Sequence, residues 1–191
     1  MAGVDEAGRG PLAGPVVAAA VILDPARIPD GLDDSKRLTA RARERAESLI
    51  RAAALVGVGE ANVPEIDALG ILRATYLAMA RALAALPVAP DHALVDGPRP
   101  PPNLRIPAEG VVGGDGLSLS IAAASIVAKV WRDRIMRDLA QQHPGYGWET
   151  NMGYGVESHI RALHRLGPTP IHRRGFAPLR HMVWQGESGG D

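Results

Sequence analysis

The sequence predicts an α/β domain in which helices cover a small sheet. Three observations support this fold class. Two apolar, β-branched stretches near the N-terminus are joined by a turn rich in glycine and proline, apolar residues between 69 and 86 recur with a helical period, and a long helical stretch begins near residue 118. The chain has no internal repeat and no second core, so we expect its C-terminal part to form a helical cap on the same α/β layer.

The composition excludes several kinds of protein and of functional site. A chain of 191 residues with 46% hydrophobic residues is long enough for one domain with a substantial core. It has no cysteine, which excludes disulfides, thiolate metal sites and cysteine nucleophiles. The longest apolar run, Leu12–Leu23, is well short of the roughly 20 residues of a membrane-spanning helix. Asp5 and Glu6 stand where a signal peptide would be cationic, so we expect a soluble, cytoplasmic protein.

The first elements are a β-hairpin and a helix. Strands are predicted at Ala2–Asp5 and Val16–Leu23, with Gly8–Pro15 as the turn between them. After a polar loop, Thr39 is a suitable N-cap for a helix that runs to about Ala54. The hydroxyl oxygen of an N-cap threonine accepts a hydrogen bond from the first helical turn, which is why this residue type favours a helix start.

A strand and a second helix are predicted next. Apolar residues alternate over Leu55–Val63, as in a strand, and Pro64 suits the first position of the following helix. The apolar positions of that helix recur every three or four residues: Leu69, Leu72, Tyr76, Met79, Leu83 and Leu86. This stripe indicates one helix face packed on the core, with a coiled-coil seam as the less favoured alternative.

The second half of the chain predicts two short strands and two helices. The strands fall at His92–Val95 and, after a proline-rich stretch, at Arg105–Val112. The helices run from about Ser118 to Gln142 and from about Val156 to Leu166. The longer helix has an apolar stripe made of Ala124, Ala128, Trp131, Ile135 and Leu139.

Positive and negative charges are equal in number over the whole chain, but they are distributed unevenly along the sequence. Residues 1–35 contain six acids against two bases, and residues 129–174 contain eight bases against four acids. This separation suits a polyanion that contacts the basic segment near cations bound by the acidic one, although two ordinary solvated faces would look the same. Only Lys36 and Lys129 are lysines among 21 basic residues. A compact ammonium on a phosphate is one interpretation, and chance is the other.

Carboxylates follow three of the predicted strands. Asp5 and Glu6 end the first strand, Asp96 ends the fourth, and Asp115 follows the fifth. Strand ends of an open sheet are where sites collect, and oxygen ligands without cysteine favour Mg²⁺ or Mn²⁺. Adjacent strand residues point to opposite faces, so Asp5 and Glu6 share a site only where the strand ends or twists. For an aspartate before glycine, such as Asp96, turn formation is the alternative.

Glycines and aromatic residues suggest contacts with a ligand. The tripeptide 8–10 is too short for a phosphate-binding loop, but its position after paired acids favours close approach of bare backbone to a ligand. Tyr146, Trp148 and Tyr154 lie among glycines near basic residues, where aromatic faces suit stacking on a sugar or base. For Tyr146 and Trp148 we favour packing within their own loop.

Six motifs together resemble ribonuclease HII. They are Val4–Pro15, Asp34–Lys36, Asp96–Gly97, Gly114–Asp115, Ala123–Val130 and Gly153–Gly155. The resemblance extends in order to about Arg180 and implies a ribonuclease H-like fold, with a five-stranded mixed sheet flanked by helices. It implies a catalytic core at residues 1–142 and a C-terminal helical substrate-binding region of the same domain at 143–184. The polar residues 185–191 are expected to form a flexible tail.

The resemblance also implies an activity. It is endonucleolytic cleavage of the RNA strand of RNA/DNA hybrids and incision 5′ of single ribonucleotides in duplex DNA, which removes misincorporated ribonucleotides and RNA primers. Two divalent ions, Mg²⁺ or Mn²⁺, would support hydrolysis to 5′-phosphate and 3′-hydroxyl ends. The expected partners are these nucleic acids, with no membrane and no protein partner deducible, and we expect a monomer.

Individual residues match the family's functional positions. The acids that would act in catalysis by binding metal are Asp5, Glu6, Asp96 and Asp115. The main chain of Gly8, Arg9 and Gly10 matches the segment that contacts the ribose 2′-OH, the group that distinguishes RNA from DNA. Tyr154 matches a tyrosine that stacks on the next deoxyribose. The residues interpreted as phosphate contacts or as support for the site are Lys36, Ser125 and Lys129.

Other residues and other protein classes remain as alternatives. We expect Asp133 to pair with its neighbours Arg132 and Arg134, and the histidines 159, 164 and 172 to be phosphate or surface partners rather than general bases. The related ribonuclease HIII has a lysine in the tripeptide and an added N-terminal domain, whereas four residues precede Asp5 here. A different metal nuclease on the same fold and a non-catalytic hybrid-binding module are the competing functions.

Overall fold

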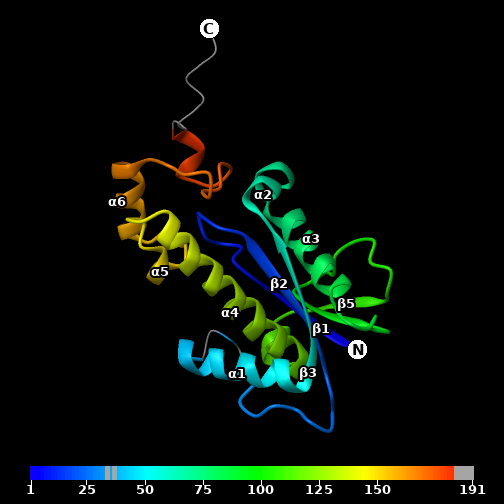
Figure 1. The fold of residues 1–191 in the computed structure, drawn as a ribbon. Helices are drawn as coiled ribbons and strands as arrows, with labels where there is room; N and C mark the ends of the chain where they lie inside the picture. Colours follow the sequence, from blue (N-terminus) through cyan, green and yellow to red (C-terminus); the bar gives the residue numbers. More distant parts are fainter. Residues whose placement is uncertain (33–34, 36–37, 183–191) are drawn as a thin grey trace.

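A mixed five-stranded sheet forms the centre of the protein. The structure, a computed structural model, describes residues 1–32, 35 and 38–182. The strands are β1 (Ala2–Ala7), β2 (Val16–Leu23), β3 (Ala54–Ala61), β4 (Ala93–Asp96) and β5 (Ala108–Val111), in the order β3-β2-β1-β4-β5. β1 pairs antiparallel with β2 and parallel with β4, β3 pairs antiparallel with β2, and β5 pairs parallel with β4. The predicted mixed sheet and hairpin are confirmed (Figure 1).

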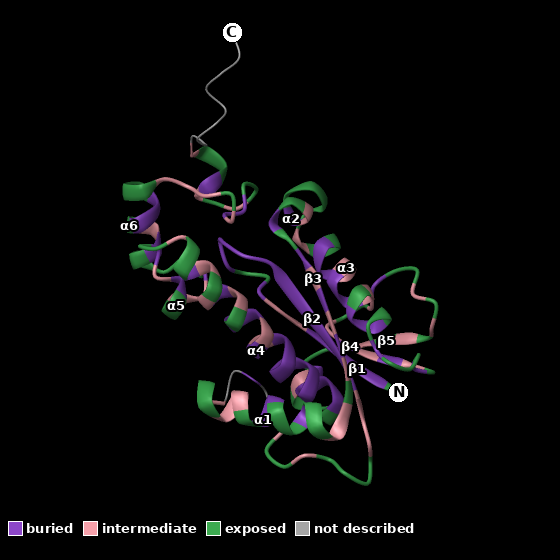
Figure 2. Ribbon diagram, in the orientation of Figure 1, coloured by how far each residue is buried: buried purple, intermediate pink, exposed green. Residues whose placement is uncertain are grey.

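Helices cover both faces of the sheet. They are α1 (Ala40–Ala53), α2 (Val63–Leu69), α3 (Ile71–Ala84), α4 (Leu119–Gln142), α5 (Trp148–Asn151) and α6 (Glu157–Leu166), with short 3₁₀ turns at Gly114–Gly116 (η1) and Leu179–His181 (η2). α4 and α1 pack against one face and α3 against the other. The central strands are therefore buried on both sides (Figure 2), which explains why β2 is a continuous apolar run. Thr39 caps α1 as predicted, accepting a hydrogen bond from Ala42.

Small residues let the helices approach the sheet closely. A Cβ atom added at Gly3 of β1 would lie 2.1 Å from the backbone carbon of Ser120 in α4. A Cβ at Gly59 of β3 would lie 2.3 Å from the carbonyl oxygen of Ala78 in α3. Side chains at these two positions would push both helix layers outward, so the glycines set the thickness of the domain.

The helix predicted to start at Pro64 is interrupted. Gly70 has φ 76° and ψ 155°, outside helical geometry, and separates α2 from α3. The apolar stripe restarts in a new phase after this break, so Leu69 and Leu72 are 41% and 50% exposed while Met79 is buried. The prediction of one continuous face from Leu69 to Leu86 is therefore wrong at its N-terminal end, because a glycine at a helix end changes the chain direction.

The C-terminal end of α4 carries a second small core rather than contacting the sheet. The residues buried there are Arg132, Asp133, Met136 and Ala140, in place of the predicted Trp131, Ile135 and Leu139. α5 and α6 pack around this end (Figure 1), with Tyr146 stacked on Trp148 at a ring distance of 5.1 Å. The packing predicted for these two aromatics is confirmed. None of the helices in the described ranges combines the length and apolar character that crossing a bilayer requires.

Adding one methyl group at Gly3 tests the close contact between β1 and α4. We expect Gly3→Ala to lower the free energy of unfolding by about 2 kcal/mol or more, because the new Cβ meets backbone that has no rotamer to change. Gly175→Ala is the matched control, since nothing lies within 4 Å of a Cβ built there. Chemical denaturation of both variants measures the difference, and equal midpoints would show that α4 does not lie this close to the strand.

Candidate active site

Three carboxylates converge at one edge of the sheet. Asp5 and Glu6 lie near the C-terminal end of β1, and Asp96 lies at the C-terminal end of β4. Because β1 and β4 are parallel neighbours, these two ends meet. One carboxylate oxygen from each residue lies within 4.8 Å of the others. Asp5 Oδ1 also accepts a hydrogen bond of 2.7 Å from the amide of Glu6.

Burial and like charge act against ionisation of this group. The pKa of Asp5 is raised well above its usual value, mainly because the side chain is buried and also because Glu6 and Asp96 are negative. Burial raises the pKa of Glu6 as well, and the ion pair with Arg9 partly offsets this. The three acids therefore destabilise one another unless a cation or protons neutralise them.

One oxygen of Glu6 has no partner among the described residues. Oε1 accepts a hydrogen bond of 3.2 Å from Arg9, whereas the buried Oε2 has no hydrogen-bond partner there. Buried polar atoms are rarely left unsatisfied, so this oxygen indicates that the site takes a ligand. Carboxylate oxygens are the ligands preferred by Mg²⁺ and Mn²⁺, and the donor set of Asp5, Glu6 and Asp96 fits such an ion.

The fourth predicted acid, Asp115, lies outside this group. It is on η1, the 3₁₀ turn that follows β5, and it lines a different hollow together with Leu32 and Leu117. The turn is nevertheless tied to the site, since the amide of Gly114 donates a hydrogen bond of 2.8 Å to Asp96 Oδ1. The structure thus brings three of the four acids together, and the residue before Asp115 donates a hydrogen bond to one of them.

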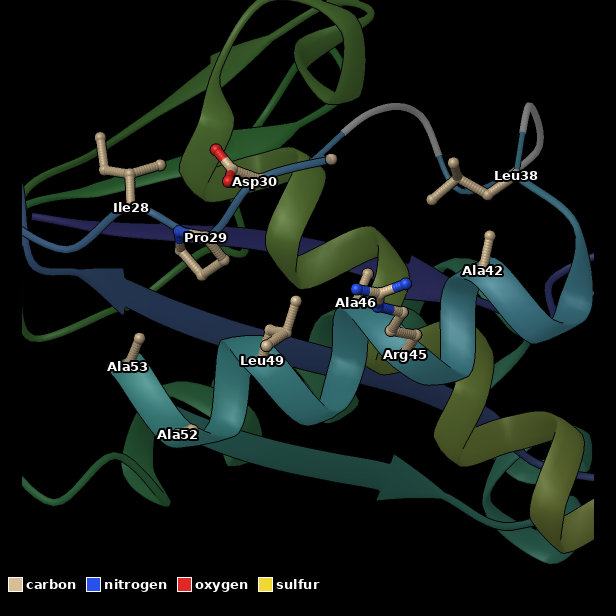
Figure 3. A pocket seen from close by; sticks show the side chains of 11 residues that line it. Ile28, Pro29, Asp30, Leu38, Ala42, Arg45, Ala46, Leu49, Ala52 and Ala53 are labelled. Atoms are coloured by element: carbon tan, nitrogen blue, oxygen red, sulfur yellow. The ribbon is translucent and has the colours of Figure 1, made fainter.

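A cavity of about 230 Å³ contains most of the other predicted site residues. Besides the three acids it is lined by Gly8, Arg9, Gly10, Ser35, Ser125, Lys129 and Tyr154. These residues come from the loop after β1, from the loop before α1, from α4 and from the segment before α6. Lys36 lies outside the described residues. A larger apolar cavity of about 700 Å³ lies between residues 28–31 and α1 (Figure 3), but no carboxylate cluster lines it.

Ser125 and Lys129 line the cavity from α4. Ser125 is hydrogen-bonded to Ser35 at 2.8 Å, and its hydroxyl partly offsets the rise in the pKa of Asp5. Lys129 forms an ion pair with Asp133 on the next helical turn, and Arg43 lies 3.9 Å from the other Asp133 oxygen. The ion pair predicted for Asp133 therefore exists with different partners. Adjacent residues on a helix point in different directions, so the predicted neighbours 132 and 134 do not face Asp133.

Two histidines predicted at the surface are buried in the C-terminal core. His159 and His172 have no exposed area, and burial lowers the pKa of both, that of His172 to about 3. Trp148 Nε1–H donates to His159 Nε2, so the proton of His159 is on Nδ1 and faces the carbonyl oxygen of Tyr154 at 2.9 Å. His159 thereby anchors the backbone of a residue that lines the cavity. The surface interpretation is wrong for these two histidines.

Several basic residues of 129–174 bind groups of the protein itself, some in its interior and some at its surface. Arg132 and Arg173 are 1% and 0% exposed, so the prediction that this segment faces a polyanion is wrong for both. Arg134 and Arg137 form ion pairs with glutamates of α1 at 3.0 and 3.1 Å. A charge count along the sequence cannot separate cations that bind groups of the protein itself from cations that face a ligand.

Fold and site together define a class. A mixed five-stranded sheet flanked by helices, with acids converging on adjoining strand ends, is the arrangement of a ribonuclease H-like protein. Ribonuclease H2 from Pyrococcus horikoshii superposes with a TM-score of 0.78 and 28% identity, covering 94% of each chain. The RNase HII of Archaeoglobus fulgidus, solved in a complex with PCNA, gives 0.73 and 26% identity, covering 95% of this chain and 97% of that one.

The particular family follows from the sequence comparison. Residues 2–179 match the ribonuclease HII family, so the chain belongs to it. A ribonuclease HII from Ruegeria pomeroyi is 63% identical over 185 residues, which is 97% of this chain and 79% of the relative. The protein is therefore an endoribonuclease of the ribonuclease H type, which acts on RNA paired with DNA. The resemblance carried by the six motifs is confirmed.

Removing one carboxylate should stabilise the metal-free protein. The raised pKa of Asp5 means that folding favours its protonated form, so stability present at low pH is lost as pH rises through that pKa. We expect Asp5→Asn to raise the unfolding temperature at pH 8 in EDTA by a few degrees, since one pKa unit corresponds to about 1.4 kcal/mol. The gain should shrink as the pH is lowered.

The control is Asp138→Asn on the exposed face of α4, which should leave the unfolding temperature unchanged. Differential scanning calorimetry at pH 8 and pH 5 measures both variants. An equal or lower unfolding temperature for Asp5→Asn at pH 8 would contradict the electrostatic description of the site.

Proposed function

We propose that this protein hydrolyses the RNA strand of RNA/DNA hybrids and incises 5′ of single ribonucleotides in duplex DNA, with 5′-phosphate and 3′-hydroxyl products. One observation supports this most directly. A single cavity is lined by three carboxylates, by the tripeptide 8–10 and by Tyr154. It thus combines groups suited to phosphodiester hydrolysis with groups suited to recognising a sugar. Removal of misincorporated ribonucleotides and RNA primers is the proposed role.

The acids would hold two divalent ions, Mg²⁺ or Mn²⁺. Asp5, Glu6 and Asp96 would bind one of them, with Glu6 Oε2 as the ligand atom that lacks a protein partner among the described residues. Asp115, whose turn is attached to Asp96 through the Gly114 amide, would complete the set. Such ions lower the pKa of a bound water and stabilise the leaving oxygen, so no side chain need be the nucleophile.

The tripeptide would recognise the ribose through its main chain. Gly8 has φ +93°, and a Cβ there would lie 2.0 Å from the Nε atom of Arg132, so only glycine fits. At Gly10 a Cβ would lie 3.7 Å from the Tyr154 ring, an ordinary contact. Packing therefore does not require glycine at position 10, and the space it leaves faces the cavity. A main-chain donor there suits the 2′-OH, which deoxyribose lacks.

Tyr154 would stack on the neighbouring deoxyribose. Its side chain is 43% exposed, while its backbone is fixed on both sides: the amide donates to the Asn151 carbonyl at 2.9 Å, and the carbonyl is held by His159. A fixed backbone with an exposed ring provides a rigid stacking surface. Residues 143–184 are in this way the proposed substrate-binding region of a cytoplasmic, monomeric enzyme.

Substitution of the acids tests the catalytic assignment. We expect Asp5→Asn and Asp96→Asn to reduce cleavage to background, because each removes a charged ligand of the proposed ions, while binding of an RNA/DNA hybrid persists. Asp138→Asn should cleave normally. Gel mapping of products from a labelled duplex with one ribonucleotide, with Mg²⁺ and Mn²⁺ compared, measures activity and cut position.

The same assay separates the competing functions. Cleavage of an all-DNA duplex at equal rate would indicate a different metal nuclease, and tight hybrid binding without cleavage would indicate a binding module. Full activity in either acid variant would overturn the site assignment.

Loss of the Tyr154 ring tests the stacking role. We expect Tyr154→Ala to slow cleavage at a single embedded ribonucleotide by about 5- to 100-fold, the range expected from stacking worth about 1–3 kcal/mol. Tyr154→Phe is the matched control, since it keeps the ring and should retain most activity. Thermal unfolding of both variants is measured in parallel. A loss of stability that accounts for the whole loss of activity would count against this role.

A further inference from the structure

A buried arginine of the C-terminal region holds the loop that follows the catalytic strand. Arg173 is fully buried. Asp67 of α2 offsets part of the cost of burying this charge, but it does not hydrogen-bond to the guanidinium. The guanidinium instead donates hydrogen bonds to main-chain carbonyl oxygens: Gly8 at 2.6 Å, Arg9 at 2.9 Å, Gly14 at 2.9 and 3.0 Å, and Pro15 at 3.2 Å. Burying a cation is expensive, so these carbonyl dipoles must replace most of its hydration shell.

A second buried arginine contacts the same loop at other places. Arg132 of α4 donates hydrogen bonds to the carbonyl oxygens of Ala13 at 3.1 Å, Pro15 at 3.0 Å and Met152 at 3.0 Å. It does not bond to the carbonyls of Gly8 or Arg9. Two guanidiniums of the same chemistry and burial thus share one loop. Arg132 packs against Gly8, but only Arg173 donates hydrogen bonds to carbonyl oxygens of the tripeptide.

The direction of two carbonyls fixes the direction of two amides. In a trans peptide the C=O group and the N–H group of the next residue point in opposite directions. The Gly8 and Arg9 carbonyls point at Arg173, so the N–H groups of Arg9 and Gly10 point away from it. Arg9 and Gly10 line the cavity, and within the described part of the chain neither amide donates to a protein acceptor.

We propose that Arg173 is the positioning residue for ribose recognition: by holding the Gly8 and Arg9 carbonyls it presents the Arg9 and Gly10 amides to the 2′-OH. Discrimination between ribose and deoxyribose then depends on a residue 164 positions from Arg9 in the sequence. This inference rests on the proposed function, in which the tripeptide contacts the 2′-OH. Arg173 does not touch the substrate and acts only through the loop.

The test compares Arg173→Lys with Arg132→Lys. Lysine keeps the charge, but its single ammonium cannot span the carbonyls that a planar guanidinium reaches. Each variant is combined with Asp96→Asn, which prevents cleavage. Fluorescence anisotropy then gives the affinity for a duplex with one ribonucleotide relative to an all-DNA duplex of the same sequence.

We expect Arg173→Lys to reduce this affinity ratio by about five- to tenfold, the effect of losing one or two hydrogen bonds, and Arg132→Lys to leave it within twofold. Both variants should unfold at lower temperature, because both lose buried hydrogen bonds. An unchanged ratio in Arg173→Lys, or an equal fall in Arg132→Lys, would overturn the proposal. Arg173→Gln, which removes the buried charge and keeps an N–H donor, should lower the ratio in the same way.

Two further outcomes are decisive. If Arg132→Lys folds and neither Arg173 variant does, Arg173 serves folding and the proposal is overturned. If the protein with Arg173 intact shows no preference for the ribonucleotide duplex and no ribonucleotide-dependent cleavage, the proposed function fails and this inference fails with it. A clear preference that the Arg173 variants retain would overturn this inference alone.

Discussion

The structure depends most on how the loop between β1 and β2 is held. Its backbone is hydrogen-bonded to the C-terminal region, with the Leu12 amide donating to the Gly153 carbonyl at 2.8 Å and the Gly14 amide donating to Ile171 at 3.0 Å. The buried guanidiniums of Arg132 and Arg173 together donate hydrogen bonds to five carbonyl oxygens of the loop, those of Gly8, Arg9, Ala13, Gly14 and Pro15. The C-terminal region therefore forms a wall of the candidate site rather than an appendage. Without it the loop would lose its hydrogen bonds to Gly153, Ile171 and Arg173 and keep only those from Arg132 of α4.

The acids of the candidate site and the fully buried cations have different surroundings. The acids at the ends of β1 and β4 face the cavity and repel one another, whereas the buried cations Arg132 and Arg173 face backbone dipoles. A formal net charge of zero thus hides negative charge that a metal ion can neutralise and positive charge that no ligand reaches. In the proposed function, specific contacts from the tripeptide and Tyr154, rather than a general cationic coat, would then supply much of the recognition of nucleic acid.

Local sequence predicted the elements whose signals are local. The hairpin, the Thr39 cap and the position of Asp96 at the end of β4 follow from apolar runs that stop at polar residues. The strand predicted to end at Asp5 continues to Ala7, because its pairing with β2 extends that far. The position of Asp115 outside the group of three acids did not follow, because it lies on a 3₁₀ turn after β5 rather than at the strand end. The buried role of Arg173 was also missed, because its partners are about 160 residues away and are carbonyls common to every residue. For His159 a signal existed: it shares one buried face of α6 with Ala162 and Leu163, at spacings of three and four residues.

The acids proposed for catalysis and the tripeptide proposed for ribose recognition are separated by a single residue in the sequence. Only Ala7 separates Glu6 from Gly8, so two residues of extended backbone, at most about 7 Å, link a carboxylate of the site to the first glycine of the tripeptide. The Arg9 side chain also donates a hydrogen bond to Glu6 Oε1, which connects the tripeptide to the same acid a second time. With the tripeptide fixed from behind by Arg173, the amides that would contact a 2′-OH lie at a set distance from the acids. A ribose held by these amides brings its adjoining phosphodiester to the carboxylates, whereas a deoxyribose offers no hydroxyl by which to be held there.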